Sequence, residues 1–229
     1  MDAVVKVGGS LAEEPERVIA LCSKLSALGK TYGLVVVPGG GRFADAVRDS
    51  DQRFKLSSGV SHRMAILGID QFGMLLAQIM PNSCATYSLE DARELAETEA
   101  TPIFLPSRLL SREDPLTNSW DVTSDSIAAY VAGRLQAAKL VLVTDVDGIF
   151  TNDPKTNDDA ALIEQMSSEE LLKLNKRTSV DVFLAKLLLE SPVDCYVVNG
   201  KYPERVEAVL AGQQTTCTLI SAGTDKHTL

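Results

Sequence analysis

Four short segments, rich in glycine or in acidic residues, contain the residue types that bind phosphate groups. The first, KVGGS, places Lys6 two residues before the pair Gly8 and Gly9, with Ser10 behind them. Glycine lets backbone N–H groups approach an anion closely, and the lysine adds a positive charge. An ordinary strand-to-turn junction has the same composition, so this segment alone is a weak signal.

The second segment, PGGGR, has three consecutive glycines, Gly39, Gly40 and Gly41, followed by Arg42. The N–H groups in the first turn of a helix have no partner within the helix and attract anions. A tight turn needs only one glycine, so three of them favour an anion site over simple packing. The fingerprints GxGxxG and GxxxxGK[ST] are absent, which argues against the usual nucleotide-binding folds.

The third and fourth segments carry carboxylates. DVTSDS, from Asp121 to Ser126, opens a predicted helix with more polar groups than one N-cap requires. TDVDGIFTNDPK, from Thr144 to Lys155, follows an apolar run and ends in a turn. This pattern is typical of a loop that contacts the sugar, base or phosphates of a ligand. A capping cluster and a solvated acidic loop are the structural alternatives.

Apolar periodicity predicts the elements that position these segments. Apolar runs alternate with helical patterns, which indicates right-handed βαβ units and one mainly parallel sheet. Ligands bind such sheets at the carboxyl ends of their strands, where the four segments fall. We therefore expect a single three-layer α/β/α sandwich over residues 1–229. The strands are expected at Ala3–Val7, Leu34–Val37, Ile103–Leu105, Leu140–Thr144 and Tyr196–Val198, and the helices at Pro15–Leu28, Arg42–Arg53, Val60–Met80, Ser124–Leu135, Val182–Glu190 and Pro203–Leu210.

Composition excludes several classes of protein. The 229 residues include 22 Lys and Arg against 31 Asp and Glu, a net charge of −9, so a nucleic-acid partner is not expected. No apolar run approaches the ~18 residues that cross a bilayer, and the N-terminus lacks a basic leader, so we expect a cytoplasmic protein with no membrane contact. Two histidines and four dispersed cysteines argue against a zinc site and suit a reducing compartment.

The order and spacing of all four segments resemble the amino acid kinase superfamily, which includes acetylglutamate kinase, aspartokinase, uridylate kinase and isopentenyl phosphate kinase. The resemblance covers nearly the whole chain. It implies phosphoryl transfer from ATP with Mg²⁺, whose protein ligands the sequence does not identify. It also implies a homo-oligomer built from dimers. An N-terminal lobe of about residues 1–135 would bind the acceptor, and a C-terminal lobe of about residues 136–223 the nucleotide.

The resemblance also implies roles for individual residues. Lys6 and Lys155 match lysines that neutralise the transferring phosphoryl group, and Asp125 matches the carboxylate that holds them in place. The family segment GGMxxK is reduced here to Lys186. The expected phosphate-binding residues are Gly8, Gly9, Ser10, Gly39, Gly40 and Gly41, and the expected nucleotide-binding residues are Thr144, Asp145, Asp147, Gly148, Phe150, Asp153 and Pro154.

Within the superfamily, the segments 38–44, 61–65, 119–126 and 197–206 resemble the kinases of (aminomethyl)furanylmethyl phosphate in methanofuran biosynthesis, found in archaea and methylotrophs. This implies a small phosphomonoester as the acceptor. A carboxylate kinase is the alternative enzyme, and an ATP-binding oxyanion store or a nucleotide sensor is the alternative class. The expected acceptor-binding residues are Arg42, His62, Arg63, Trp120 and Asp121. For His62 and Trp120 we also consider simple packing in the core.

Overall fold

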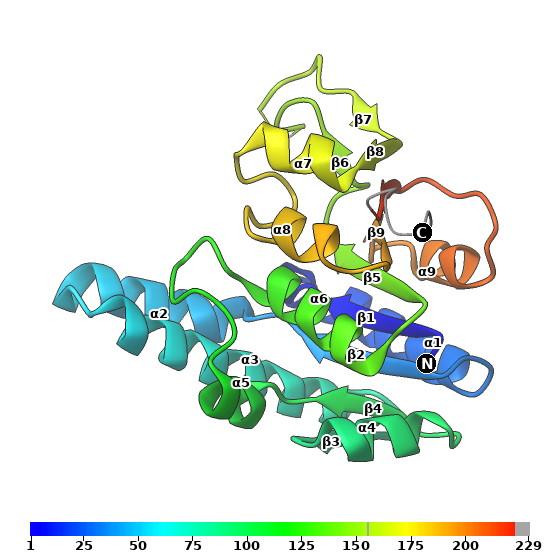
Figure 1. Cartoon of the computed structure of the whole chain (residues 1–229). Helices are drawn as coiled ribbons and strands as arrows, with labels where there is room; N and C mark the ends of the chain where they lie inside the picture. Colours follow the sequence, from blue (N-terminus) through cyan, green and yellow to red (C-terminus); the bar gives the residue numbers. More distant parts are fainter. Residues whose placement is uncertain (155, 223–229) are drawn as a thin grey trace, which may run out of the picture.

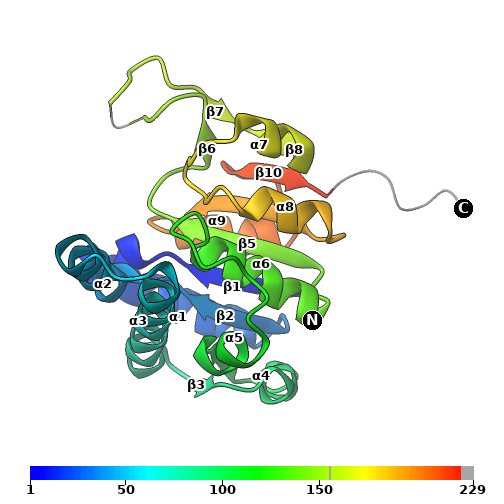
Figure 2. The same ribbon diagram turned by 60° about the vertical axis from the view of Figure 1, so that its left-hand side comes forward.

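Strand β1, Ala3–Val7, lies in the middle of an eight-stranded sheet in the computed structural model, which describes residues 1–154 and 156–222 (Figures 1 and 2). The strand order is β3-β4-β2-β1-β5-β9-β10-β8, and only the β9–β10 pairing is antiparallel. The other strands are β2 Leu34–Pro38, β3 Ser83–Thr86, β4 Thr101–Phe104, β5 Lys139–Thr144, β8 Gln165–Ser167, β9 Asp194–Asn199 and β10 Thr218–Ser221.

Helices cover both faces of this sheet, because alternate residues of its buried central strands enter two separate hydrophobic clusters. One cluster includes Val4, Val35 and Leu140, and the other includes their neighbours Val5, Val36 and Val141. The expected mainly parallel α/β/α sandwich is confirmed. The first face is covered by α4 Leu89–Ala96, α5 Ser107–Glu113, α6 Ser124–Leu135, α7 Ser168–Leu174 and α8 Leu184–Leu189, and the second by α1 Pro15–Gly29, α9 Pro203–Leu210 and the C-terminal half of α3 Ser58–Ile79.

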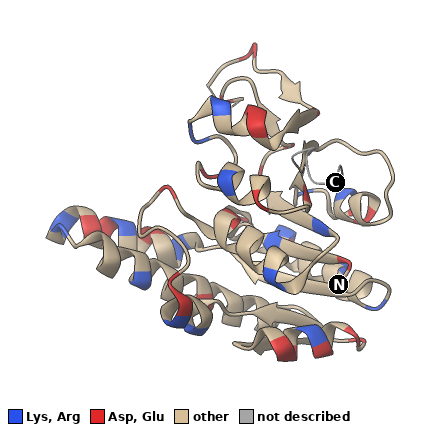
Figure 3. Ribbon diagram, viewed as in Figure 1, with Lys and Arg blue, Asp and Glu red and all other residues tan. Residues whose placement is uncertain are grey.

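Helix α2, Gly41–Phe54, packs along α3 and extends past the edge of the sheet (Figure 1). Val47 is its only fully buried residue. Acidic and basic residues alternate along it (Figure 3), and surface ion pairs join Arg48 to Asp45 and Arg53 to Asp49. Within the described part of the chain, no helix combines the length and apolar character needed to cross a membrane.

Several short elements were not expected from the sequence. They include the 3₁₀ turn η1 Gly9–Glu13 and a separate hairpin of β6 Ile149–Phe150 with β7 Leu162–Ile163, as well as β3, β8, β10, α4, α5 and α7. Such short segments contain too few residues for a periodic pattern. The helix expected over Val182–Glu190 begins two residues later, at Leu184, because the Asp181 carboxylate accepts the Leu184 N–H at 2.9 Å and so fixes the start of α8.

The first two glycine turns are packed directly against each other. The Gly8 N–H donates to the Val143 carbonyl and the Gly39 N–H to the Val7 carbonyl, both at 2.8 Å, so these two groups extend the strand ladders. A Cβ atom on Gly9 would lie 2.1 Å from the Gly41 nitrogen. Because no side chain fits there, Gly9 allows the turns after β1 and β2 to touch.

We therefore expect Gly9→Ala to destabilise the protein by about 1–3 kcal/mol, because one of the two turns has to move. Gly133→Ala is the matched control: Gly133 lies inside α6, with nothing within 4 Å of an added Cβ. Alanine there should stabilise the helix by about 0.5–1 kcal/mol. Chemical denaturation of both variants measures the difference, and equal effects would contradict the close approach.

Candidate active site

A buried ion pair joins the central strand to the start of α6. The Lys6 Nζ and the Asp125 Oδ1 atoms lie 2.8 Å apart, and the two residues are only 7% and 5% exposed. A Cβ atom on Gly8 would lie 3.7 Å from the same Nζ, so the ammonium group sits against the first glycine turn. Burial of either charge alone would be costly, and each makes the other tolerable. The pair fixes a positive charge beside the turn.

A second buried carboxylate, which the sequence analysis did not identify, supports Asp125. The Asp181 N–H donates to the Asp125 Oδ2 at 3.2 Å, and Asp181 is only 2% exposed. Burial, together with the nearby Asp125 charge, raises the pKa of Asp181. A signal was present in the sequence, since an aspartate three residues before an apolar helical run is typical of an N-cap.

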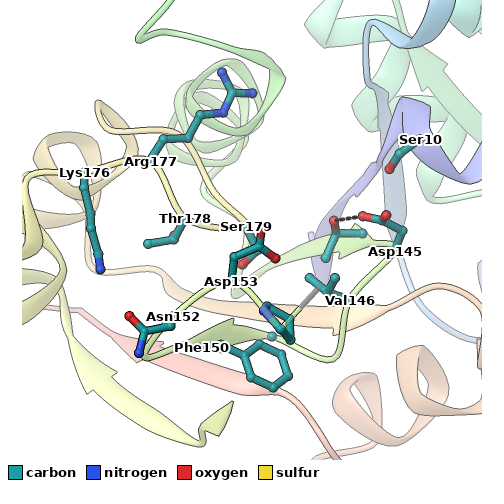
Figure 4. A pocket seen from close by; sticks show the side chains of 13 residues that line it. Ser10, Asp145, Val146, Phe150, Asn152, Asp153, Lys176, Arg177, Thr178 and Ser179 are labelled. Atoms are coloured by element: carbon teal, nitrogen blue, oxygen red, sulfur yellow. Dashed lines mark hydrogen bonds between the residues drawn. The ribbon is translucent and has the colours of Figure 1, made fainter. Parts of the chain in front are cut away.

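A cavity of about 420 Å³ lies beyond the carboxyl end of β5 (Figure 4). We call it the β5 cavity. Three segments that are distant in the sequence form its wall: the first glycine turn, the loop after β5 and the segment before α8. The lining residues are Ser10, Thr144, Asp145, Val146, Gly148, Phe150, Asn152, Asp153, Pro154, Lys176, Arg177, Thr178 and Ser179.

Six of the expected nucleotide-binding residues line this cavity, namely Thr144, Asp145, Gly148, Phe150, Asp153 and Pro154. Asp147, the seventh, interacts elsewhere, and its role in nucleotide binding stays a prediction. Its Oδ1 accepts from Asn199 Nδ2 at 2.8 Å and from Arg205 at 2.6 Å, and it is not part of the described lining. We assign it to anchoring the loop against β9 and α9. Lys155, the second expected lysine, lies outside the described residues.

The segment before α8 contributes residues that the sequence analysis missed. Lys176, Arg177, Thr178 and Ser179 line the β5 cavity, as does Asn152 on the loop that faces them (Figure 4). The adjacent Lys and Arg give the wall positive charge suited to an anion. The sequence did contain a signal for this anion-binding wall, namely two adjacent basic residues in a chain with a net negative charge. Lys186, the retained lysine of the family segment, lies on α8 with its ammonium 5.3 Å from the centre of the Phe183 ring.

A smaller cavity of about 160 Å³ lies between α2, α3 and the loop before α6; we call it the α2–α3 cavity. It brings together His62 and Trp120, two of the expected acceptor-binding residues. The Trp120 indole N–H donates to Asp51 at 2.7 Å, and Arg48 stacks on the ring. Burial lowers the pKa of His62, with partial opposition from Asp114, which favours a neutral imidazole. The lining residues are Asp51, Leu56, Ser58, Ser61, His62, Ala65, Ser119, Trp120 and Val122.

The other three expected acceptor residues are exposed. Arg42 donates two hydrogen bonds to Glu13, at 2.9 and 2.7 Å, and its side chain is 78% exposed. Arg63 lies on the surface of α3. Asp121 is exposed, and its carbonyl accepts the Phe183 N–H at 3.4 Å. Among the described residues, none of the three belongs to the lining of either cavity.

The cysteines do not form a reactive or metal-binding cluster. All four are free thiols, and burial raises the pKa of Cys22 to about 12. Over residues 1–154 and 156–222 there is no group of three or more His, Cys, Asp or Glu side chains arranged to hold a metal ion.

The buried ion pair is close in sequence to residues that line both cavities. Ser10, from the turn above Lys6, lines the β5 cavity, and Val122, three residues before Asp125, lines the α2–α3 cavity. The N–H groups in the first turn of α2 add donors beside the same turn. This arrangement suits the movement of an anionic group from one cavity to the other.

Comparison with known proteins is consistent with this geometry. A family model described as the amino acid kinase family matches residues 1–189. The chain is 34% identical to [5-(aminomethyl)furan-3-yl]methyl phosphate kinase of Methanocaldococcus jannaschii, covering 97% of this chain and 99% of that protein. It is 30% identical to the uridylate kinase of Thermofilum pendens, over 96% and 97% of the two chains.

The fold matches as well. The crystal structure of uridylate kinase from Archaeoglobus fulgidus superposes with a TM-score of 0.77 at 23% identity, covering 96% of this chain and all of that one. Because the family model matches residues 1–189 and a relative is 34% identical over nearly the whole chain, this protein belongs to the amino acid kinase family.

Proposed function

We propose that this protein is an ATP-dependent kinase that transfers the γ-phosphoryl group of ATP to a small phosphomonoester and forms a diphosphate. The β5 cavity binds ATP, and the acceptor binds on the side of α2 and α3. The observation that carries the proposal is the buried Lys6–Asp125 pair, whose neighbours in the chain, Ser10 and Val122, line the two cavities. The name of the M. jannaschii relative describes a kinase of the same class, which acts on a phosphomonoester. We therefore favour (aminomethyl)furanylmethyl phosphate as the acceptor.

The residues present fit such a reaction. Lys176 and Arg177 on the wall of the β5 cavity match the charge of a nucleotide's phosphates, and its volume is within the usual range for ligand sites. Mg²⁺ bound with ATP neutralises phosphate oxygens. Carboxylates bind this ion in proteins, and the cavity wall carries two, Asp145 and Asp153.

The chemistry requires no general base from the protein. An oxygen of the acceptor phosphate attacks the γ-phosphorus, the bond to the bridging oxygen breaks, and ADP leaves. A phosphomonoester has a second pKa of about 6, so its oxygen is already largely ionised at neutral pH. Lys6 and the N–H groups of the glycine turns offset the negative charge on the transferring group.

The size of the α2–α3 cavity separates the acceptor classes. At about 160 Å³ it is below the usual range for ligand sites, which supports a single small ring over a whole nucleoside monophosphate. A carboxylate acceptor would need cations alone, whereas this cavity is lined by Asp51, a mainly neutral His62 and the Trp120 ring. An aminated ring suits that lining.

A cytoplasmic location remains a prediction.

Asp125→Asn should lower kcat about a hundredfold or more, because the amide no longer holds the Lys6 charge in place. The Kd for ATP should change less than threefold, since the nucleotide cavity is lined by other residues. Loss of one partner of a buried pair also costs up to about 3–5 kcal/mol of folding stability. Turnover and ATP binding are therefore compared well below the melting temperature. Parallel losses of both would assign Asp125 to a purely structural role.

An acceptor panel tests the function directly. With ATP and Mg²⁺, ADP release should be fastest with aminated phosphomonoesters such as (aminomethyl)furanylmethyl phosphate, and slower with UMP, acetylglutamate and aspartate. Faster turnover of UMP or of a carboxylate would contradict the acceptor assignment and leave only the family. Stoichiometric ATP binding without turnover of any acceptor would favour a storage or sensing protein.

The same assay tests the exposed arginines. Arg63→Ala or Arg42→Ala should raise the KM for the acceptor by about tenfold or more, because the family resemblance leads us to expect their guanidinium groups to contact the acceptor phosphate, while the KM for ATP stays unchanged. Arg17→Ala is the matched control, since Arg17 is an exposed arginine of α1 paired with Glu14. An equal rise in the control would exclude a specific contact.

We also propose that the protein forms a homodimer through α3. Val60, Met64, Leu67 and Met74 are all exposed on this helix at intervals of four, three and seven residues, which places them on one stripe. The 22-residue helix is about 33 Å long, so a second copy crossing it by a two-fold axis would cover the stripe.

Leu67→Glu should shift the protein to a smaller species in size-exclusion chromatography with light scattering, because it places a charge in the apolar stripe. Leu172→Glu is the control, as Leu172 is an exposed leucine on α7. A wild-type protein that is monomeric at micromolar concentration would contradict the dimer.

A further inference from the structure

Asp181 has more hydrogen-bond donors around it than any single helix cap requires. Its carboxylate accepts the Thr123 N–H and hydroxyl, each at 2.8 Å, the Ser126 N–H at 3.0 Å and hydroxyl at 2.6 Å, and the Leu184 N–H at 2.9 Å. These donors lie at the starts of α6 and α8. One buried carboxylate therefore joins the starts of two helices, so a movement of either start reaches it.

The same residue contacts the carboxylate of the ion pair. Its backbone N–H donates to Asp125 Oδ2 at 3.2 Å, while Asp125 Oδ1 faces Lys6 Nζ at 2.8 Å. Lys6 pairs with Asp125, and Asp181 contacts Asp125 through its backbone N–H. The positive end of α6 and the N–H donors offset the remaining negative charge. A displacement of Asp181 moves a hydrogen-bond partner of Asp125 and so the position of the lysine.

Asp181 is also tied to the wall of the β5 cavity. Ser179, which lines the cavity, is separated from Asp181 only by Val180, whose side chain is 2% exposed. The Thr178 N–H donates to the Val180 carbonyl at 3.2 Å, which closes this short stretch on itself. Because three consecutive residues span at most about 11 Å, we expect a ligand that displaces Ser179 to act on the backbone of Asp181 as well.

We propose that Asp181 is a positioning residue that couples occupancy of the β5 cavity to the placement of Asp125 and Lys6. The inference rests on the proposed binding of ATP in that cavity. Asp181 contacts neither cavity itself among the described lining residues, so it acts through Asp125. Nucleotide binding at the 176–179 wall then also aligns Lys6. The catalytic groups are therefore correctly placed only when the nucleotide is present.

Trp120 reports this coupling. It is the only tryptophan of the chain, and it lies outside the β5 cavity. The Phe183 N–H, two residues after Asp181, donates to the carbonyl of Asp121, the neighbour of Trp120. Thr123, held by Asp181, lies three residues further along the same loop. Movement of the 176–183 segment therefore reaches the environment of the indole.

The experiment titrates the full-length protein with ATP and Mg²⁺, following heat by calorimetry and Trp120 emission in the same samples. Wild type should show a saturable emission change with the calorimetric Kd. Asp181→Asn should bind ATP within threefold of wild type, lose the emission change, and lose about a hundredfold in kcat. Ser126→Ala removes a single hydroxyl donor, is tolerated in a helix, and should give an intermediate loss of both.

Asp70→Asn is the matched control. Asp70 is a buried carboxylate, 4% exposed, that accepts the Ser107 N–H at 3.2 Å at the start of α5. This variant should lose stability but keep the emission change and kcat. If it loses kcat as Asp181→Asn does, or if both Asp181→Asn and Ser126→Ala keep the wild-type response, the coupling is overturned.

The wild-type result also distinguishes failure of the coupling from failure of the proposed function. A wild-type protein that binds ATP with no change in Trp120 emission overturns the coupling and leaves the kinase assignment intact. A wild-type protein that gives no heat with ATP and Mg²⁺ overturns the proposed function, and the coupling with it.

Discussion

The buried pair of Lys6 and Asp125 is the interaction on which the arrangement of the site depends. A cation and a carboxylate are removed from water together, and such pairs contribute little net stability compared with well-packed apolar side chains. The pair therefore constrains the fold more than it stabilises it. It requires β1 to be central and α6 to begin beside it, and the sheet order meets that requirement by placing β1 between β2 and β5.

The glycine turns follow from the same constraint. Phosphate-binding turns are usually explained by free N–H groups, but the N–H groups of Gly8 and Gly39 are used by the strand ladders. Gly9 is needed because the two turns touch at this position. A Cβ atom on Gly9 would lie 2.1 Å from the Gly41 nitrogen in the turn after β2. The absence of a side chain at Gly9 lets the turns after β1 and β2 lie side by side next to Lys6. Donors for an anion come from the N–H groups in the first turn of α2.

The two cavities of the site differ in the charged groups that line them. The β5 cavity carries Lys176 and Arg177 on a wall that faces Asp145 and Asp153, and it suits a polyanion that arrives with its own cation. The α2–α3 cavity is smaller and combines Asp51 with an imidazole that burial keeps mainly neutral. Asp181 lies two residues from the wall of the first cavity and contacts Asp125, the carboxylate that pairs with Lys6.

The sequence by itself determined the class of fold and most of the loop after β5. The parallel strands are continuous apolar runs and the long helices have apolar stripes, so local periodicity was enough. Six of the predicted residues line the β5 cavity because they all lie on one segment, Thr144 to Pro154, that follows a single strand. The short elements, of two to eight residues, were missed because so few residues carry little or no periodic pattern.

Only the tertiary structure decided which polar groups meet. Asp181 lies 55 to 58 residues from Ser126 and Thr123, and Asp147 pairs with Arg205, 58 residues away. Nothing in the local pattern of charges distinguishes Asp147, which anchors a loop, from Asp145, which lines the cavity. Hydrogen bonds and ion pairs between distant segments depend on how the sheet brings strand ends together, and sequence spacing does not encode that distance.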